Sequence, residues 1–227
     1  AGGHSPLPTM KSGLASPEVL VDIGRVDELR GVEVDGDTAT IGALTPYSEI
    51  EGSAPLREGC PVVHQAAAAI GDVQVRNMGT VGGNLAHADP ASDMPAGILA
   101  ADATMNLTGP DGSRSVAAED FFRGMYETAV SEGELLTSIE ISTGDGNEAS
   151  TYVKRPSPAS GYAMVGVGAA VRTDGHEVDA ARVAVTGATD HAVRLGPVEE
   201  ALAGAKLSSE VITDAAQLAT DDLAGAS

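Results

Sequence analysis

Two short segments of the sequence combine paired glycines with side chains that can hydrogen-bond. Residues 1–5 read AGGHS, and residues 80–84 read TVGGN. Glycine lets the backbone adopt positive φ and lets a ligand approach it closely, and successive exposed N–H groups bind anions. Ser5, Thr80 and Asn84 add neutral hydrogen-bonding groups. Together the two loops predict a site that binds a diphosphate from two sides without lysine or arginine.

Neither loop matches the two common phosphate-binding motifs. No Gly-Lys-Ser/Thr follows either glycine pair, so neither is a P-loop, and no G-x-G-x-x-G lies between a predicted strand and a helix. Most Gly-Gly pairs are only turns. The loops therefore indicate a phosphate-bearing ligand without naming it.

Two aspartates, Asp89 and Asp93, follow the second loop. They could cap helices, or they could accept hydrogen bonds from ribose hydroxyls or from a ring N–H. Because a carboxylate repels phosphate, the second role would place them at the sugar or ring part of a nucleotide. The residues alone leave both interpretations open.

In their order and spacing, these segments resemble the FAD-binding subunits of molybdenum hydroxylases. The similarity covers residues 1–11 (AGGHSPLPTMK), 76–84 (RNMGTVGGN) and 89–95 (DPASDMP). Segments 133–141, 152–156 and 160–163 also resemble the family. The resemblance extends over essentially the whole chain and is strongest to the medium subunit of aerobic carbon monoxide dehydrogenases.

The resemblance implies roles for individual residues in binding FAD. The two loops would line the diphosphate from opposite sides, Asp93 would contact the ribityl chain or the ring, Lys154 would approach the flavin, and Tyr162 would cover one face of the ring. The expected cofactor-binding residues are Ala1, Gly2, Gly3, His4, Ser5, Ile70, Thr80, Gly82, Gly83, Asn84, Asp89, Asp93, Leu136, Lys154 and Tyr162. No catalytic residue and no metal ligand is expected.

Several of these residues also have a plain structural interpretation. Ile70 suits the core of a helix and Leu136 the core of a strand. Lys154 and Arg155 suit a solvated pair, and Tyr162 suits the start of a strand.

Hydrophobic periodicity and turn residues predict an α+β chain without regular βαβ alternation. The expected strands are residues 19–23, 32–34, 38–43, 104–107, 115–116, 135–141, 151–154, 162–172 and 177–186. A short helix is expected to begin at Thr45 and Pro46, with Thr45 as its N-cap. Further helices are expected after Pro61 as far as Gly71, at 96–101, and near 197–203 and 208–223, whereas residues 75–94 are expected to form a loop.

The family resemblance implies two small α+β subdomains that bind FAD, followed by a C-terminal antiparallel sheet with helices. The cluster of glycine, aspartate and asparagine at 144–147 predicts the boundary. We expect an FAD-binding domain at 1–146, divided into 1–37 and 38–146, and a C-terminal domain at 147–227. Relative to the family, a first strand, helix and strand and a C-terminal helical end are missing, so both ends are expected to be truncated.

The charge composition excludes several classes of partner. The chain of 227 residues has 33 acidic and 13 basic residues and a formal net charge of −20. Such a surface repels nucleic acids and anionic membranes. Dispersed acids and scarce lysine favour adaptation to high salt in a halophile. No apolar run reaches the roughly 18 residues of a membrane span, no signal peptide is evident, and a cytoplasmic location is expected.

The resemblance implies an electron-transfer subunit of an oxidoreductase. It would accept electrons from 2Fe–2S clusters of a small partner subunit, while a large subunit with molybdopterin oxidises the substrate, in a dimer of heterotrimers. A single cysteine, Cys60, cannot hold such clusters here. Two alternatives are a flavin reductase that acts alone and a nucleotide-binding or structural subunit without flavin.

Overall fold

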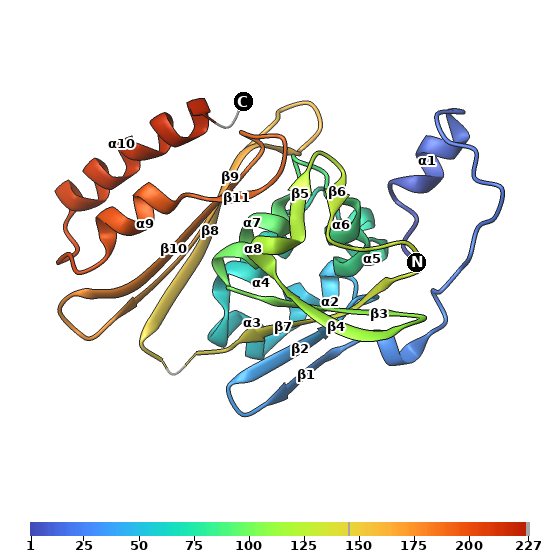
Figure 1. Cartoon of the computed structure of the whole chain (residues 1–227), viewed down its shortest axis with the longest axis horizontal. Coiled ribbons are helices and arrows are strands. Elements are labelled where there is room, and N and C mark those ends of the chain that lie inside the picture. Colours follow the sequence, from blue (N-terminus) through green and yellow to red (C-terminus); the bar gives the residue numbers. More distant parts are fainter. Residues whose placement is uncertain (145, 226–227) are drawn as a thin grey trace.

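The computed structural model describes residues 1–144 and 146–225, and it contains two antiparallel sheets with helices between and outside them (Figure 1). The first sheet has the strand order β1-β2-β7-β3-β4. Its strands are β1 (Val32–Asp35), β2 (Thr38–Gly42), β7 (Leu135–Ser142), β3 (Thr104–Gly109) and β4 (Gly112–Ala117). The expected α+β class is therefore confirmed.

Two local hairpins supply four of these five strands. In the first, Val32 pairs with Ile41 and Asp35 pairs with Thr38, and the turn places Gly36 at a φ of +57°. The expected division between residues 37 and 38 falls inside this hairpin, whose two strands share one sheet. The second hairpin joins β3 to β4, and β7 pairs with both β2 and β3 at the centre of the sheet.

Short helices pack between the two sheets. They are α2 (Tyr47–Gly52), α3 (Ala54–Gly59), α4 (Pro61–Ala69), α5 (Val73–Met78), α6 (Val81–His87) and α7 (Asp93–Ala100). Every residue of α7 is buried, because this helix contacts β9 and β10 of the second sheet as well as α4. A methyl group at Gly168 of β9 would lie 2.6 Å from the Ala96 carbonyl oxygen, so glycine allows this close approach.

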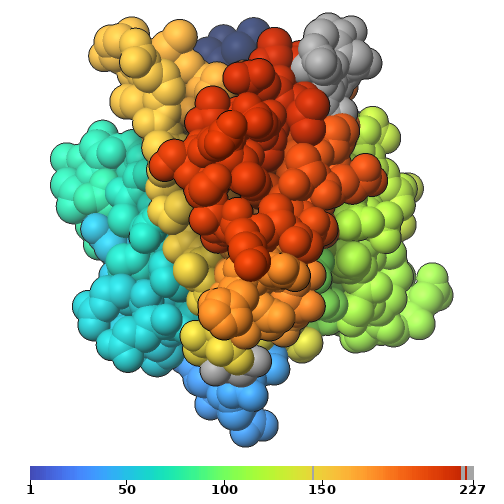
Figure 2. Space-filling view, turned by 90° about the vertical axis from the view of Figure 1, so that its left-hand side faces the viewer, coloured from blue at the N-terminus to red at the C-terminus, as the bar shows by residue number. Residues whose placement is uncertain are grey.

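The second sheet has the order β11-β10-β9-β8. It consists of β8 (Glu148–Pro156), β9 (Ala163–Thr173), β10 (Val178–Thr186) and the short β11 (Val193–Arg194). Helices α9 (Gly196–Leu202) and α10 (Ser209–Gly225) cover its outer face, as Figure 2 shows from that side. A separate apolar cluster that includes Val185, Leu202 and Ala215 holds this layer together. Within the described residues, no helix is long and apolar enough to cross a membrane.

The first segment of the chain differs from its predicted structure. Residues 19–23 form no strand, and Val19, Leu20 and Val21 are 65–76% exposed. A strand needs a neighbour that satisfies its backbone groups, and the described part of the chain places none beside this run. Only α1 (Pro6–Lys11) and the 3-10 helix Asp27–Leu29 interrupt this long connection.

Two further expectations about helices are wrong. Residues 75–94 are mostly helical, because Asp72 and Thr80 cap α5 and α6 through hydrogen bonds to Val75 and Gly83. Thr45 does not cap α2, which begins at Tyr47 after Pro46. Its hydroxyl instead bonds both the N–H and the carbonyl of Gly31.

The remaining small elements lie between β4 and β7. They are α8 (Ala118–Phe121) and the ribbon of β5 (Phe122–Gly124) and β6 (Glu127–Thr128). Tyr126, in the turn of this ribbon, has a φ of +58°, and its N–H donates to the Ala88 carbonyl at 3.2 Å. This bond ties the ribbon to the end of α6.

Candidate functional site

The two glycine loops, which are distant in sequence, meet in space. Gly2 and Gly3 both have positive φ, +59° and +75°. A methyl group at Gly2 would lie 2.9 Å from the Met78 carbonyl oxygen and 3.5 Å from the Thr80 nitrogen. The first loop can therefore lie against the start of the second only because Gly2 has no side chain.

The first loop leaves backbone donors available. Gly3 donates its N–H to the Ala1 carbonyl at 2.6 Å, and its own carbonyl accepts from Leu7. Among the hydrogen bonds of the described residues, none uses the N–H of His4 or Ser5. Two successive N–H groups after two left-handed glycines can bind an anion.

The second loop is the first turn of α6, and this corrects the expectation of a row of free N–H groups. Gly82 donates to the Ala43 carbonyl at 2.8 Å and Val81 to the Thr45 carbonyl at 3.0 Å. Gly83 donates to the Thr80 hydroxyl at 3.2 Å. Gly82 is buried and packs on Ala43, whereas Gly83 is exposed. Gly82 thus serves the packing of α6 on Ala43, whereas Gly83 leaves the surface of the first turn open.

A cavity of about 510 Å³ lies between the first loop, the exposed connection and the start of the second loop. Its size is within the range of small-molecule and cofactor sites. Four predicted residues line it, namely Ala1, Gly2, Gly3 and Thr80. Other lining residues that the sequence reasoning missed include Leu20, Arg30, Leu44, Pro46, Asn77 and Met78. Asn77 and Met78 lie just before the second loop, with Gly79 between, in the segment 76–84 that carries the family resemblance, and this position was the available signal.

A second group of predicted residues lies at the junction of α4, α7 and β8. The Lys154 ammonium donates to Asp93 Oδ2 at 2.8 Å and to the Ala69 carbonyl at 2.9 Å. Tyr152, which was not predicted, donates its hydroxyl to Asp93 Oδ1 at 2.6 Å. The Lys154 and Asp93 side chains are only 8% and 6% exposed, so the interpretation of Lys154 as a solvated residue is wrong.

Burial sets the electrostatics of this junction. It raises the pKa of the Asp93 carboxyl, and the hydrogen bonds from Lys154 and Tyr152 oppose that rise. Burial also raises the pKa of the Tyr152 hydroxyl, and the Asp93 charge adds to the effect. Tyr152 therefore remains protonated and donates, and Asp93 accepts.

Five other predicted residues lie outside these two groups. Asp89 accepts from the Ala91 N–H at 2.9 Å, which forms a local turn, and Asn84 accepts from the Ser92 hydroxyl at 2.7 Å. Tyr162 is half exposed, and its pKa is raised by burial and by the nearby Asp89. Ile70 and Leu136 are both buried in the main core, in agreement with their plain structural interpretation.

The described residues offer neither a cluster of metal ligands nor an activated thiol. Within the described residues, no group of three or more His, Cys, Asp and Glu could hold a metal ion. Cys60 is buried, and burial raises its pKa to about 11, so it is a poor nucleophile at neutral pH. What the residues offer is a cavity at the first loop, two backbone donors that follow this loop's glycines, and a buried ion pair at the junction of α4, α7 and β8.

Comparison with known proteins agrees with this geometry. Residues 1–143 match the family described as the FAD binding domain in molybdopterin dehydrogenase, and residues 150–227 match the CO dehydrogenase flavoprotein C-terminal domain. The glyceraldehyde dehydrogenase medium chain of Sulfolobus acidocaldarius is 40% identical over 95% of this chain and 76% of its own length. The carbon monoxide dehydrogenase medium chain of Hydrogenophaga pseudoflava is 37% identical over 96% of this chain and 76% of its own length.

Solved structures give the same result. Carbon monoxide dehydrogenase from Hydrogenophaga pseudoflava superposes with a TM-score of 0.92 at 38% identity, over 96% of this chain and 76% of that chain. Quinoline 2-oxidoreductase from Pseudomonas putida 86 superposes with a TM-score of 0.87 at 31% identity, over 97% and 77%. The chain belongs to the family of FAD-binding medium subunits of molybdopterin-dependent dehydrogenases.

Proposed function

We propose that this chain is the electron-transfer flavoprotein subunit of a molybdenum hydroxylase of the carbon monoxide or aldehyde dehydrogenase type. It accepts electrons from 2Fe–2S clusters of a small partner subunit and passes them to an external acceptor. A large subunit with molybdopterin holds the substrate site, and the complex is a dimer of heterotrimers. The medium chains among its relatives, which belong to carbon monoxide and glyceraldehyde dehydrogenases, support this proposal.

One observation supports the FAD assignment: the first glycine loop and Thr80, the first residue of the second loop, line a single cavity. The missing side chain at Gly2 lets the loops touch, and the cavity of about 510 Å³ opens beside them. The N–H groups of His4 and Ser5 supply donors to a diphosphate in a chain with only three lysines. The residues present therefore fit a dinucleotide with its diphosphate at the first loop.

The remaining predicted residues would hold the flavin portion and set its surroundings. Lys154 would place a buried cation near the ring, and Tyr162 would lie over one of its faces. When bound, FAD supplies the redox chemistry, and the protein contributes binding, orientation and electrostatics. A cation fixed beside the ring favours the form with more negative charge. No residue of this chain needs to act on the substrate as an acid or a base.

Gly2→Ala is the sharpest test of the diphosphate site. The added methyl group would collide with the Met78 carbonyl, so we expect the full chain to lose FAD on desalting while the wild type stays yellow. Gly13→Ala is the matched control, because Gly13 also has a positive φ, +76°, but no atom of the described residues lies within 4 Å of the added methyl group. Equal FAD retention in both variants would place the diphosphate elsewhere.

The role in electron transfer needs a second experiment. In the assembled complex, we expect the flavin to be bleached by the substrate of the large subunit only when the iron–sulfur subunit is present. Bleaching of the isolated chain by NADH at a comparable rate would favour the reductase that acts alone. A folded full chain that binds no FAD in molar salt would exclude both flavin functions.

A further inference from the structure

Tyr152 has a hydroxyl group that the proposed function does not yet use. Tyr152 and Lys154 lie two residues apart on β8, so their side chains lie on the same face of the strand. From that face the two side chains bind different oxygens of Asp93, the first residue of α7. Among the acidic residues whose burial the structure describes, Asp93 is the one that is buried.

The space for this hydroxyl is built into the neighbouring strand. A methyl group at Gly166 of β9 would overlap the Tyr152 hydroxyl and would lie 2.9 Å from Thr186 Cγ2. Thr186 is itself buried and donates to the carbonyls of Pro90 and Ser92. Gly166 and Thr186 therefore fix both the position of the Tyr152 hydroxyl and the loop that leads into Asp93.

We propose that Tyr152 is a positioning residue of the flavin site, because it holds Asp93 as an oriented, ionised carboxylate and so fixes the Lys154 ammonium. This inference rests on the proposed function. The ammonium has three N–H donors, and Asp93 and Ala69 accept two of them. The third N–H of Lys154 is left for the flavin, and the direction in which it points depends on the position of Asp93.

The hydroxyl should also control the protonation of Asp93. Burial disfavours the charged carboxylate, whereas donors to it favour it. The groups that face Asp93 are Tyr152 and Lys154 from β8, Tyr47 from α2 and Tyr162 just before β9. Lys154 is the sole cation in this set. Without the Tyr152 hydroxyl, Lys154 is the only side chain of this set that stabilises the negative charge of Asp93. Asp93 should therefore take up a proton at a higher pH.

The test is the FAD dissociation constant of the full chain, measured by quenching of flavin fluorescence over a series of pH values. For Tyr152→Phe we expect binding about tenfold weaker at neutral pH, because a hydrogen bond to a charged group is lost. We also expect the midpoint of the acid-side loss of affinity to rise by about one pH unit. Tyr126→Phe is the control, since it removes the hydroxyl of a tyrosine that is 55% exposed.

Asp93→Asn separates positioning from simple packing. Its amide cannot ionise in this range, so we expect the acid-side midpoint to disappear, and adding Tyr152→Phe should then leave the pH profile unchanged. A thermal melt of each variant without FAD measures the structural cost separately. If Tyr152→Phe lowers the melting temperature but leaves the dissociation constant and the midpoint at wild-type values, the inference is overturned and FAD binding stands. If the wild type binds no FAD, the proposed function fails with it.

Discussion

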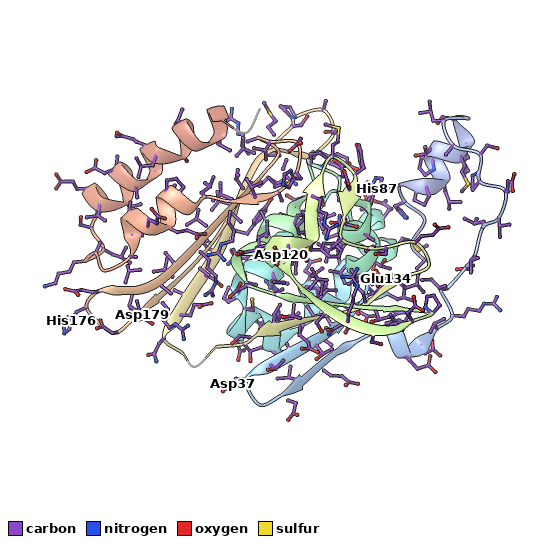
Figure 3. The ribbon with its side chains drawn as sticks, in the orientation of Figure 1. Asp37, His87, Asp120, Glu134, His176 and Asp179 are labelled. Carbon is purple, nitrogen blue, oxygen red and sulfur yellow. The ribbon has the colours of Figure 1, made fainter. Side chains whose placement is uncertain are left out.

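Glu134 is held by three hydrogen bonds that fix the loop before β7. Arg114 donates two of them, each at 2.7 Å, and the Ser131 N–H donates the third at 2.8 Å. Arg114 also donates to the Ala129 carbonyl. These bonds lower the pKa of Glu134 from 4.5 to about 2. One carboxylate thus joins the β3–β4 hairpin to the chain that enters β7, at the position labelled in Figure 3.

This pKa predicts how Glu134 contributes to stability as pH changes. A carboxyl with a lowered pKa binds protons less readily in the folded state, so its contribution is full above pH 4.5 and is lost as pH falls through about 2. Glu134→Gln should therefore unfold at a lower urea concentration than the wild type at neutral pH. The gap between the two urea midpoints should close as the pH approaches 2.

Glu132→Gln is the control for this prediction, because it removes the same charge from an exposed side chain two residues away. It should shift the urea midpoint less than Glu134→Gln does at neutral pH. If the difference between the urea midpoints of wild type and Glu134→Gln persists unchanged in acid, the loss of stability comes from the changed packing of the side chain and not from its ionisation.

The contacts among Lys154, Asp93 and Tyr152 at the buried junction could be predicted from the sequence only in part. Lys154 has Arg155 beside it and reads equally well as a solvated pair. Its partner, Asp93, is remote along the chain and becomes visible only when β8 packs on α7. Tyr152 was within reach of prediction, since strand periodicity puts it on the same face as Lys154. Only the fold reveals that both residues bind the same carboxylate, each through a different oxygen of Asp93.

At the scale of elements, the two glycines of the second loop have separable roles in α6. A methyl group at Gly82 would lie 2.7 Å from the Ala43 carbonyl oxygen, where backbone blocks it. A methyl group at Gly83 would meet, among the described residues outside the backbone of its own helix, the Thr80 hydroxyl oxygen at 2.8 Å, which belongs to a side chain. We expect Gly82→Ala to lower the free energy of unfolding by about 1–3 kcal/mol, as overpacking does.

Gly83→Ala should instead keep the stability, because alanine favours a helix more than glycine does, yet weaken FAD binding if the ligand approaches this exposed turn. Chemical denaturation and FAD titration of both variants measure the two effects. Equal losses of stability in the two variants would contradict this division of roles.

The elements that the sequence predicted correctly are those specified by local signals. Asp35 and Gly36 predict the first hairpin, and the turn at 109–112 predicts the second. The helices at 73–78 and 81–87 were missed because their glycines and asparagines resemble a loop, although Asp72 and Thr80 are good N-caps. The strand expected at 19–23 is wrong because its apolar composition favours a strand but cannot supply a neighbouring strand to pair with.

At the scale of the whole molecule, the arrangement of layers depends on contacts that no local pattern encodes. After its first residue, Asp93, helix α7 is apolar, and all of its residues are buried against α4 and the second sheet. Its composition predicts burial, but not that β9 and β10 provide one of the covering surfaces. The family resemblance implied a C-terminal antiparallel sheet with helices but not its packing on α7, and the boundary expected at residue 146 stays a prediction.

The net charge of the whole molecule predicts how its stability depends on salt concentration. The net charge is −20, and the acids lie over the surface, with Asp37 and Asp179 near the outer ends of two hairpins in Figure 3. At 1 M salt the screening length falls to about 3 Å, so repulsion between these carboxylates should weaken and the urea midpoint should rise steeply from low to molar salt. Repeating the titration near the isoelectric point of about 4.3, where the net charge vanishes, should give a much smaller rise. A salt effect of equal size at both pH values would show that salt acts through hydrophobic burial instead, and the hypothesis of a surface adapted to high salt would then lose its physical basis.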